Sequence, residues 1–182
     1  MQDLQKFKVP DDFRGKSKII VQLWWIIQGT LFAMSPQFLY GWRRFLLRCF
    51  GAEIGKGVII RPGTQITYPW KVTIGDYSWI GDDVVLYSLG EIIIGKNTVI
   101  SQKSYICTGT HDYSKIDFPI LAKKIVIGDE CWLATDVFVS PGVTINKGVV
   151  VGARSTVIKD LDSNSVYVGS PARFIKKRKI EE

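Results

Sequence analysis

Histidine is almost absent from this sequence of 182 residues, in which His111 is the only one. A zinc centre built on three histidines is therefore excluded by composition. Cysteine is also scarce, and Cys49, Cys107 and Cys131 form no CxxC pair and no grouping typical of metal ligands. Their odd number and wide spacing fit a reducing cytosol better than a disulfide framework. We therefore expect a cytoplasmic protein without a metal site.

A secretory signal is also missing, because the first 18 residues, MQDLQKFKVPDDFRGKSK, are polar and charged. The hydrophobic content of 46% and the charged content of 23% are ordinary for a folded domain and argue against disorder. The formal net charge of +7 indicates an anionic partner. Much of this charge lies in a basic C-terminal tail, residues 171–182, and no nucleic-acid-binding module accompanies it. We expect no nucleic-acid partner.

Charge is absent from residues 19–42, which read IIVQLWWIIQGTLFAMSPQFLYGW. These 24 residues are long enough to span a membrane, but glutamine, glycine, serine and proline dilute them. Pro36 is expected to end a first helix near Met34. We predict two helices, over residues 18–34 and 36–49, of which the second is amphipathic and basic.

Two interpretations of residues 1–50 follow. In the first, they form a helical cap that covers the end of the next region. In the second, residues 18–50 lie in a membrane interface, with their basic and aromatic side chains at its surface. A true membrane span is the least favoured interpretation.

After Gly51 an aliphatic residue recurs at every sixth position. The runs open with IGKG at 54, IGDY at 74, IGKN at 94 and IGDE at 127. The aliphatic positions are Ile54, Ile60, Ile66 and Val72; Ile74, Ile80, Leu86 and Ile92; Ile94, Ile100 and Ile106; and Ile127, Leu133, Val139, Ile145, Val151 and Val157. A short repeat sustained in this way indicates a stacked solenoid.

The repeat has a simple physical interpretation. Six residues form one short strand and one corner, so three repeats close a triangular coil of 18 residues. Each aliphatic side chain points inward and stacks on its equivalents roughly 4.8 Å above and below. The spacing of 20 between Ile54, Ile74 and Ile94 adds two residues to each of these coils, which we expect to form a bulged corner. The pattern predicts an all-β solenoid, a parallel β-helix over residues 51–170.

The repeat is interrupted between Ile106 and Ile127, which lie 21 positions apart. We expect a loop of residues 108–123 to leave the coil there, and this loop contains His111. A lone histidine is more often a structural residue than a catalyst. Loops that leave a solenoid corner often line its binding face, however, and an imidazole can accept a proton near neutral pH.

The [LIV]-G-x4 repeat resembles that of the hexapeptide-repeat acyltransferases, whose fold is a left-handed parallel β-helix. The resemblance alone implies the left hand. Further segments are similar to the colanic-acid-biosynthesis type of sugar O-acetyltransferase: VQLWWIIQGTLF, LYGWRRFLLRCFGAEIGKGVIIRP, TYPWKVTIGDYSWIGDDVVLYSLGE, SQKSYICTGTHDYSKIDFP and GSPAR. The resemblance covers nearly the whole chain. It implies acetyl-coenzyme A (acetyl-CoA) as donor, a sugar as acceptor, and a homotrimer with active sites between neighbouring β-helices.

In this family a histidine of the protruding loop is the general base, so the resemblance implies that role for His111. Asp83 and Asp112 are candidates for orienting its second ring nitrogen, and either is equally well explained as a corner or turn carboxylate. Members of the subgroup carry asparagine where this chain has Ser88. That departure leaves the second catalytic residue open.

The resemblance also places coenzyme A along the C-terminal coils. The positions that match its contacts are Trp132, Thr135, Ala153, Lys159, Arg173 and Lys176. Because coenzyme A carries several phosphate groups, we expect Lys159 and Arg173 to contact phosphate. Ala134 stands where glycine is commoner and still leaves room for the pantetheine arm.

The leading hypothesis is an acetyl-CoA-dependent O-acetyltransferase that acts on a sugar hydroxyl in exopolysaccharide or surface-polysaccharide biosynthesis. An N-acetyltransferase acting on an amino sugar and a non-catalytic β-helical scaffold are the alternatives. The acceptor could be free or lipid-linked. The predicted location is the cytoplasm, at the inner face of the cytoplasmic membrane if residues 18–50 contact it.

Overall fold

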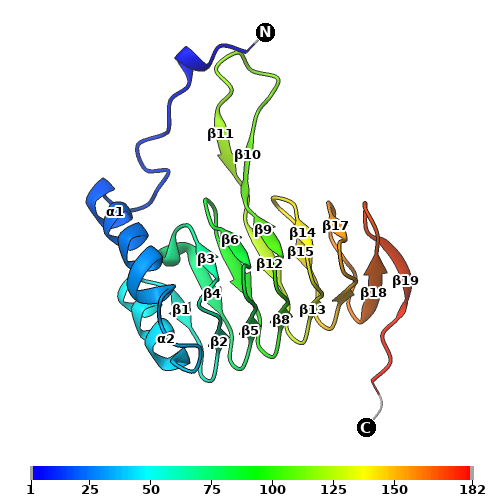
Figure 1. Ribbon diagram of the computed structural model, residues 1–182. Helices are drawn as coiled ribbons and strands as arrows, with labels where there is room; N and C mark the ends of the chain where they lie inside the picture. Colours follow the sequence, from blue (N-terminus) through cyan, green and yellow to red (C-terminus); the bar gives the residue numbers. More distant parts are fainter. Residues whose placement is uncertain (1, 181–182) are drawn as a thin grey trace.

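The computed structural model describes residues 2–180, which form a triangular parallel β-helix (Figure 1). Helices lie at one end of the solenoid, and a two-stranded arm projects from its side. We number the three faces of the solenoid in the order in which the chain visits them. A corner is named by the two faces that it joins.

Within the described residues, faces 1, 2 and 3 consist of five, seven and five strands. Face 1 contains β1 (Glu53–Ile54), β4 (Val72–Ile74), β7 (Ile92–Ile94), β12 (Ile125–Ile127) and β15 (Thr144–Ile145). Face 2 contains β2 (Ile59–Ile60), β5 (Trp79–Ile80), β8 (Val99–Ile100), β13 (Trp132–Leu133), β16 (Val150–Val151), β18 (Ser165–Val168) and β19 (Arg173–Lys177). Face 3 contains β3 (Gln65–Ile66), β6 (Val85–Tyr87), β9 (Tyr105–Cys107), β14 (Phe138–Val139) and β17 (Thr156–Val157).

The aliphatic residues of the repeat form the core. On face 2, Ile60 pairs with Ile80, Ile80 with Ile100, and Ile100 with Leu133. All four side chains are fully buried, and each contributes roughly 1.5–3 kcal/mol through the hydrophobic effect. The six-residue period therefore corresponds to one inward side chain for each face of each coil.

The corners need unusual backbone conformations. At the 2–3 corner, Asp83, Lys103, Asp136 and Arg154 occupy the left-handed region, with φ between 57° and 62°. The glycine of the IGDY signature is required for a different reason. A Cβ on Gly75 would lie 2.6 Å from the backbone nitrogen of Lys96, because successive coils approach closely there.

The extra residues of the longer coils gather at the 3–1 corner. In the first coil they form a short 3₁₀ helix, η3 (Pro69–Lys71). In the third coil the same corner extends into the arm, where β10 (Gly109–His111) pairs with β11 (Ile120–Ala122) in antiparallel register. The loop predicted over residues 108–123 is thus largely a β-hairpin.

The N-terminal region contains η1 (Leu4–Lys6), α1 (Lys18–Ile27), the π-helical η2 (Gln28–Phe32) and α2 (Tyr40–Cys49). The first regular helix is shorter than predicted, because the chain changes from α-helical to π-helical geometry after Ile27. At this change the Oγ1 of Thr30 donates to the Ile26 carbonyl at 2.6 Å. The second helix begins later than predicted, because the chain after Pro36 first makes a turn in which Leu39 donates to the Pro36 carbonyl at 3.0 Å.

The helices cover the open strand edges of the first coil. Trp24 Nε1 donates to the Ile66 carbonyl at 2.7 Å, Arg43 Nε to Ile60 at 2.6 Å, and Arg48 to Ile54 at 2.6 Å. Each of β3, β2 and β1 thus has a backbone carbonyl that accepts a hydrogen bond from a helix side chain. These contacts cover the strand edges and prevent edge-to-edge pairing with another chain.

The opposite end is closed by β19, which pairs with β18 in antiparallel register. Residues 173–177 of the predicted basic tail are therefore part of a sheet, because their backbone groups pair with the last coil. Residues 181–182 lie outside the described range. Between residues 2 and 180, no helix has both the length and the apolar character that crossing a membrane requires.

Candidate functional site

His111 is the last residue of β10 and is half-buried. Its Nδ1 lies 2.9 Å from the Phe118 carbonyl oxygen. Because a carbonyl oxygen can only accept a hydrogen bond, Nδ1 carries the proton in this contact. In the neutral imidazole, the lone pair is therefore on Nε2, which is the form that a general base requires.

Phe118 makes a second contact with the same ring. The two rings stack with centroids 4.2 Å apart and planes 8° from parallel. The backbone of Phe118 has a φ of 45°, a conformation that bulky side chains rarely adopt. Sequence reasoning missed this partner, because a backbone carbonyl has no signature in the residue pattern.

Asp112, one of the predicted partners, is engaged elsewhere. Its Oδ1 accepts hydrogen bonds from the Ser114 backbone nitrogen at 3.1 Å and the Ser114 Oγ at 2.5 Å. These hydrogen bonds lower the pKa of the Asp112 carboxyl, and the Lys115 ammonium lies 3.8 Å away. The carboxylate thus organises the turn that follows β10.

Asp83, the other predicted partner, lies at the 2–3 corner, whereas the arm leaves the 3–1 corner. The structure does not bring Asp83 and His111 together within one chain. Ser88, at the position where the subgroup has asparagine, is fully buried. Its Oγ accepts from the Tyr68 nitrogen at 2.8 Å and donates to the Tyr68 carbonyl at 3.0 Å, so it links two coils.

A groove of about 480 Å³ lies at the foot of the arm. It is lined by Phe13, Trp70, Lys71, Leu89, Gly90, Glu91, Ile120, Leu121 and Ala122. Ile120 is the register partner of His111, so the groove adjoins the candidate base. The Lys71 ammonium donates to the Phe13 and Leu89 carbonyls, both at 2.6 Å, and burial lowers its pKa.

The residues predicted to bind coenzyme A fall into two groups. Trp132 projects from face 2, and Thr135 and Ala153 follow at the 2–3 corner of successive coils. These two coils are joined there, because the Arg154 backbone nitrogen donates to the Thr135 carbonyl at 2.9 Å. Arg173 and Lys176 lie on β19, also on face 2. Lys159 follows β17 and lies at the 3–1 corner, apart from the other five.

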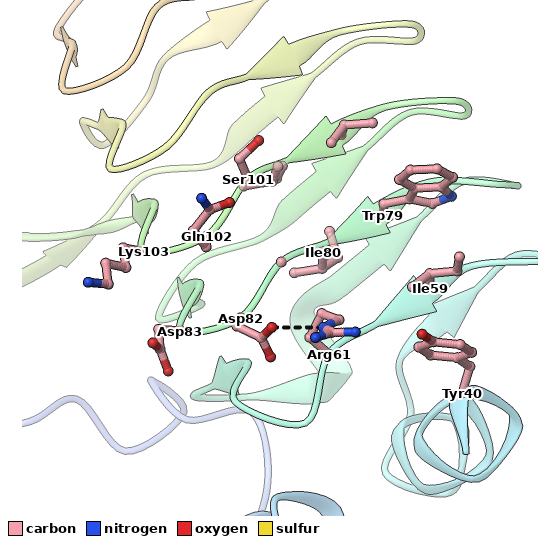
Figure 2. Close-up of a pocket in the computed structure, with 13 residues that line it drawn as sticks. Tyr40, Ile59, Arg61, Trp79, Ile80, Asp82, Asp83, Ser101, Gln102 and Lys103 are labelled. Atoms are coloured by element: carbon pink, nitrogen blue, oxygen red, sulfur yellow. Dashed lines mark hydrogen bonds and ion pairs between the residues drawn. The ribbon is translucent and has the colours of Figure 1, made fainter. Parts of the chain in front are cut away.

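A second groove, of about 520 Å³, runs along face 2 (Figure 2). Arg61 donates to Asp82 at 2.8 Å within it, while Trp79 and Tyr40 form an aromatic end. Ser101 lines this groove and accepts from Trp132 Nε1 at 3.1 Å. The groove therefore adjoins the predicted cofactor residues. Of its lining residues only Asp83 is a site candidate from sequence, because Tyr40 comes from α2 and the other residues from three coils.

Over 178 residues the chain is 64% identical to the putative colanic acid biosynthesis acetyltransferase WcaF of Escherichia coli (strain K12), and the match covers 98% of each chain. The chain belongs to this acetyltransferase family. The family predicted from sequence, and acetyl transfer as the class of activity, are confirmed. No family model matches the sequence. In the part of this acetyltransferase that the structure describes, no three histidine, cysteine, aspartate or glutamate side chains are grouped to hold a metal ion.

Solved structures show the same architecture. The maltose O-acetyltransferase of Clostridium difficile 630 has a TM-score of 0.81 at 26% identity, and the match covers 90% of each chain. A hexapeptide-repeat acetyltransferase of Vibrio cholerae O1 biovar eltor, solved with acetyl-CoA, has a TM-score of 0.83 at 24% identity. That match covers 99% of this acetyltransferase and 100% of the other chain. The parallel β-helix predicted from the repeat and the left hand implied by the resemblance are both confirmed.

Proposed function

We propose that this acetyltransferase transfers the acetyl group of acetyl-CoA to a sugar hydroxyl in surface-polysaccharide biosynthesis, with His111 as general base. The observation that carries the proposal is the hydrogen bond between His111 Nδ1 and the Phe118 carbonyl at 2.9 Å. It places the lone pair of the neutral imidazole on Nε2, on an arm that projects from the solenoid beside a groove.

In the proposed reaction, Nε2 accepts the proton of the acceptor hydroxyl while its oxygen bonds to the thioester carbonyl carbon. The carbon–sulfur bond then breaks, and the imidazolium returns the proton to the departing thiolate. The acetyl ester and free coenzyme A are the products. Removal of a positioned general base costs at least about 100-fold in turnover.

Trp132, Thr135, Ala153, Arg173 and Lys176 bind the donor in this proposal, with Lys159 at the other corner. Arg173 and Lys159 supply cations for its phosphate groups. Face 2 suits a long ligand, because Trp132 and Arg173 lie on it in different coils and Thr135 and Ala153 follow at its edge.

The active site is formed between copies in a homotrimer. Lys159 lies at the 3–1 corner, from which the arm with His111 projects. Asp83 lies at the 2–3 corner, and the other five donor-binding residues lie on face 2 or at that same corner. A neighbouring copy that packs its face 2 against the arm brings both groups to one site, and rotational symmetry repeats this contact in each copy.

The groove at the foot of the arm binds the acceptor. Trp70 and Phe13 supply flat aromatic surfaces that pack against sugar rings, and Glu91 supplies hydrogen-bond acceptors for hydroxyls. The location in the cytoplasm and the lipid-linked form of the acceptor remain predictions.

The first experiment measures thiol release from acetyl-CoA with a panel of hydroxyl and amino sugars, and mass spectrometry identifies the product. We expect acetyl esters, which hydroxylamine cleaves. Hydroxylamine-stable amides would support the alternative of an N-acetyltransferase. No transfer to any sugar would overturn the proposed sugar acceptor.

The second experiment tests the base. His111→Ala is expected to lower kcat at least about 100-fold. Tyr113→Ala is the matched control on the same arm, because that side chain is 89% exposed. Wild-type turnover in His111→Ala would overturn the assignment.

Membrane contact through residues 18–50 is a further part of the proposal. Ile19, Met34 and Phe38 are 80%, 79% and 75% exposed. Other large apolar side chains exposed on the same helices and turn are Ile20, Leu23, Trp25, Ile26, Leu31, Leu39, Trp42 and Phe45. Residues 13–52 contain no acidic residue and six arginines and lysines, of which all but the buried Arg43 are half-buried or exposed. A second copy presenting the same surface would be repelled, whereas an anionic bilayer matches both the charge and the apolar side chains.

Flotation with vesicles containing phosphatidylglycerol tests the contact. Wild type is expected to float with these vesicles and much less with neutral phosphatidylcholine, whereas Met34→Glu and Phe38→Glu remain at the bottom. Ile158→Glu is the control, because this exposed residue lies on the solenoid. If the wild type does not float and the Met34→Glu and Phe38→Glu variants lose the oligomer, the surface contacts another copy instead of a membrane.

A further inference from the structure

The chain before α1 reaches across to the arm. The Asp3 backbone nitrogen donates to the Ile116 carbonyl at 2.6 Å, near the tip of the arm. Figure 1 shows the N-terminal segment beside that tip. Farther along, the carbonyls of Phe13 and Arg14 accept hydrogen bonds from Lys71 at 2.6 Å and Trp70 at 2.7 Å. We call residues 3–14 the strap, because it is anchored at the tip of the arm and at the groove at its foot.

Between these anchors, the strap places an aromatic ring on the candidate base. The Phe7 ring centroid lies 5.9 Å from that of His111, with the planes at 47°. The strap is ordered locally as well, since Asp3 accepts from the Gln5 nitrogen at 3.1 Å and Phe7 donates to the Leu4 carbonyl at 3.2 Å. His111 therefore contacts two phenyl rings, one from its own arm and one from the start of the chain.

The contact from the arm needs a rare backbone conformation. With φ at 45°, Phe118 presents both its carbonyl oxygen and its ring to the same imidazole. Such conformations persist only where the surrounding structure enforces them, and they gather at functional sites. The hydrogen bond fixes the tautomer of His111, and the stacked ring fixes the plane of the imidazole.

We propose that Phe7 and Phe118 are positioning residues that hold His111 Nε2 in its reactive direction, so that turnover depends on the docked strap. The inference rests on the proposed role of His111 as general base. The arm is a two-stranded hairpin that projects from the solenoid, and the strap reaches it near its tip. Phe7 thus adds a ring contact on His111 from a segment outside both the arm and the solenoid.

The prediction for Phe7 separates positioning from binding. In the full-length protein, Phe7→Ala is expected to lower kcat about 10-fold, because displacing a catalytic group by about 1 Å costs up to about 100-fold. The KM for acetyl-CoA should stay unchanged, since none of the proposed donor-binding residues belongs to the strap. Phe7→Tyr keeps the ring and should restore kcat. Leu4→Ala is the control in the same strap, because Leu4 is exposed.

Phe118→Gly isolates the second ring. Glycine adopts a φ of 45° without strain and keeps the carbonyl that accepts from Nδ1. We expect a loss of kcat similar to that of Phe7→Ala, and a melting temperature close to wild type for both variants. Wild-type kcat in Phe118→Gly would show that the stacked ring has no positioning role.

A double-mutant cycle with His111→Ala decides whether Phe7 acts through His111. If it does, Phe7→Ala causes no further loss in the His111→Ala background, where product is followed by mass spectrometry during long incubations. Equal losses in both backgrounds, or wild-type kcat in Phe7→Ala alone, would overturn the inference. Wild-type turnover in His111→Ala alone would instead refute the proposed function.

Discussion

The guanidinium Nε of Arg43 donates to the backbone carbonyl of Ile60 at 2.6 Å. Arg43 is fully buried, and its other nitrogens donate to Ser35 Oγ at 2.7 Å, the Pro36 carbonyl at 3.0 Å and the Gln37 carbonyl at 2.6 Å. Burial lowers the pKa of Arg43. One side chain thus joins α2, the turn before it and the first coil of the solenoid.

Arg43→Leu is therefore expected to lower the free energy of unfolding by about 3–5 kcal/mol, because it leaves buried acceptors without donors. Arg44→Leu should cost only about 1 kcal/mol, since Arg44 is half-buried and donates only to the Val58 carbonyl, at 2.7 Å. Urea unfolding followed by circular dichroism measures both. Equal losses would contradict the role of Arg43 as the central contact of the cap.

Replacing either of two glycines by alanine should change the stability of the protein, in opposite directions at the two positions. Gly75→Ala places a Cβ 2.6 Å from Lys96 N and 2.7 Å from the carbonyl carbon of Gly95, so we expect a loss of about 1–3 kcal/mol. Gly29→Ala meets no atom within 4 Å and lies in helical backbone, where alanine stabilises by up to about 1 kcal/mol. Melting temperatures of the two variants test this contrast. A destabilised Gly29→Ala would contradict it.

The three thiols should react in order of exposure. Cys49 is exposed, Cys107 is half-buried and Cys131 is buried. Burial raises the pKa of Cys107 and of Cys131, so their thiolate fractions are small at about pH 8, near the usual thiol pKa. Iodoacetamide labelling followed by peptide mass spectrometry should show Cys49 first. As the pH rises further, the labelling rate of an ordinary thiol levels off once it is fully ionised. The labelling rate of Cys107 should still increase there, because its pKa is raised. Native labelling of Cys131 before Cys49 would contradict the burial.

Arg173 tests the donor site. If its guanidinium contacts a phosphate of acetyl-CoA, Arg173→Gln should raise the KM for acetyl-CoA about 10-fold, with kcat unchanged. Lys147→Gln is the control, because that ammonium pairs with Glu130 at 3.1 Å and neither residue belongs to a proposed site. Steady-state kinetics with varied acetyl-CoA measure both. An unchanged KM in Arg173→Gln would remove Arg173 from the donor site.

Repetition made the fold predictable. Six-residue spacing requires an inward side chain on each face, so Ile60, Ile80 and Ile100 could be placed in one stack before any coordinates. Helix boundaries were less predictable, because the π-helical turn depends on local contacts such as the Thr30 hydrogen bond. The β19 strand was missed, because its residues look like a solvated basic run until the last coil offers β18 as a partner.

The sequence by itself determined the β-helix, the interruption that carries His111 and the absence of any second histidine. A period, an insertion and a composition are properties of the chain alone. Only the tertiary structure decided what His111 contacts. Phe118 reaches it through a backbone conformation, and Phe7 through a strap that begins far away in sequence. Such contacts depend on how distant segments pack, and no spacing in the sequence encodes them.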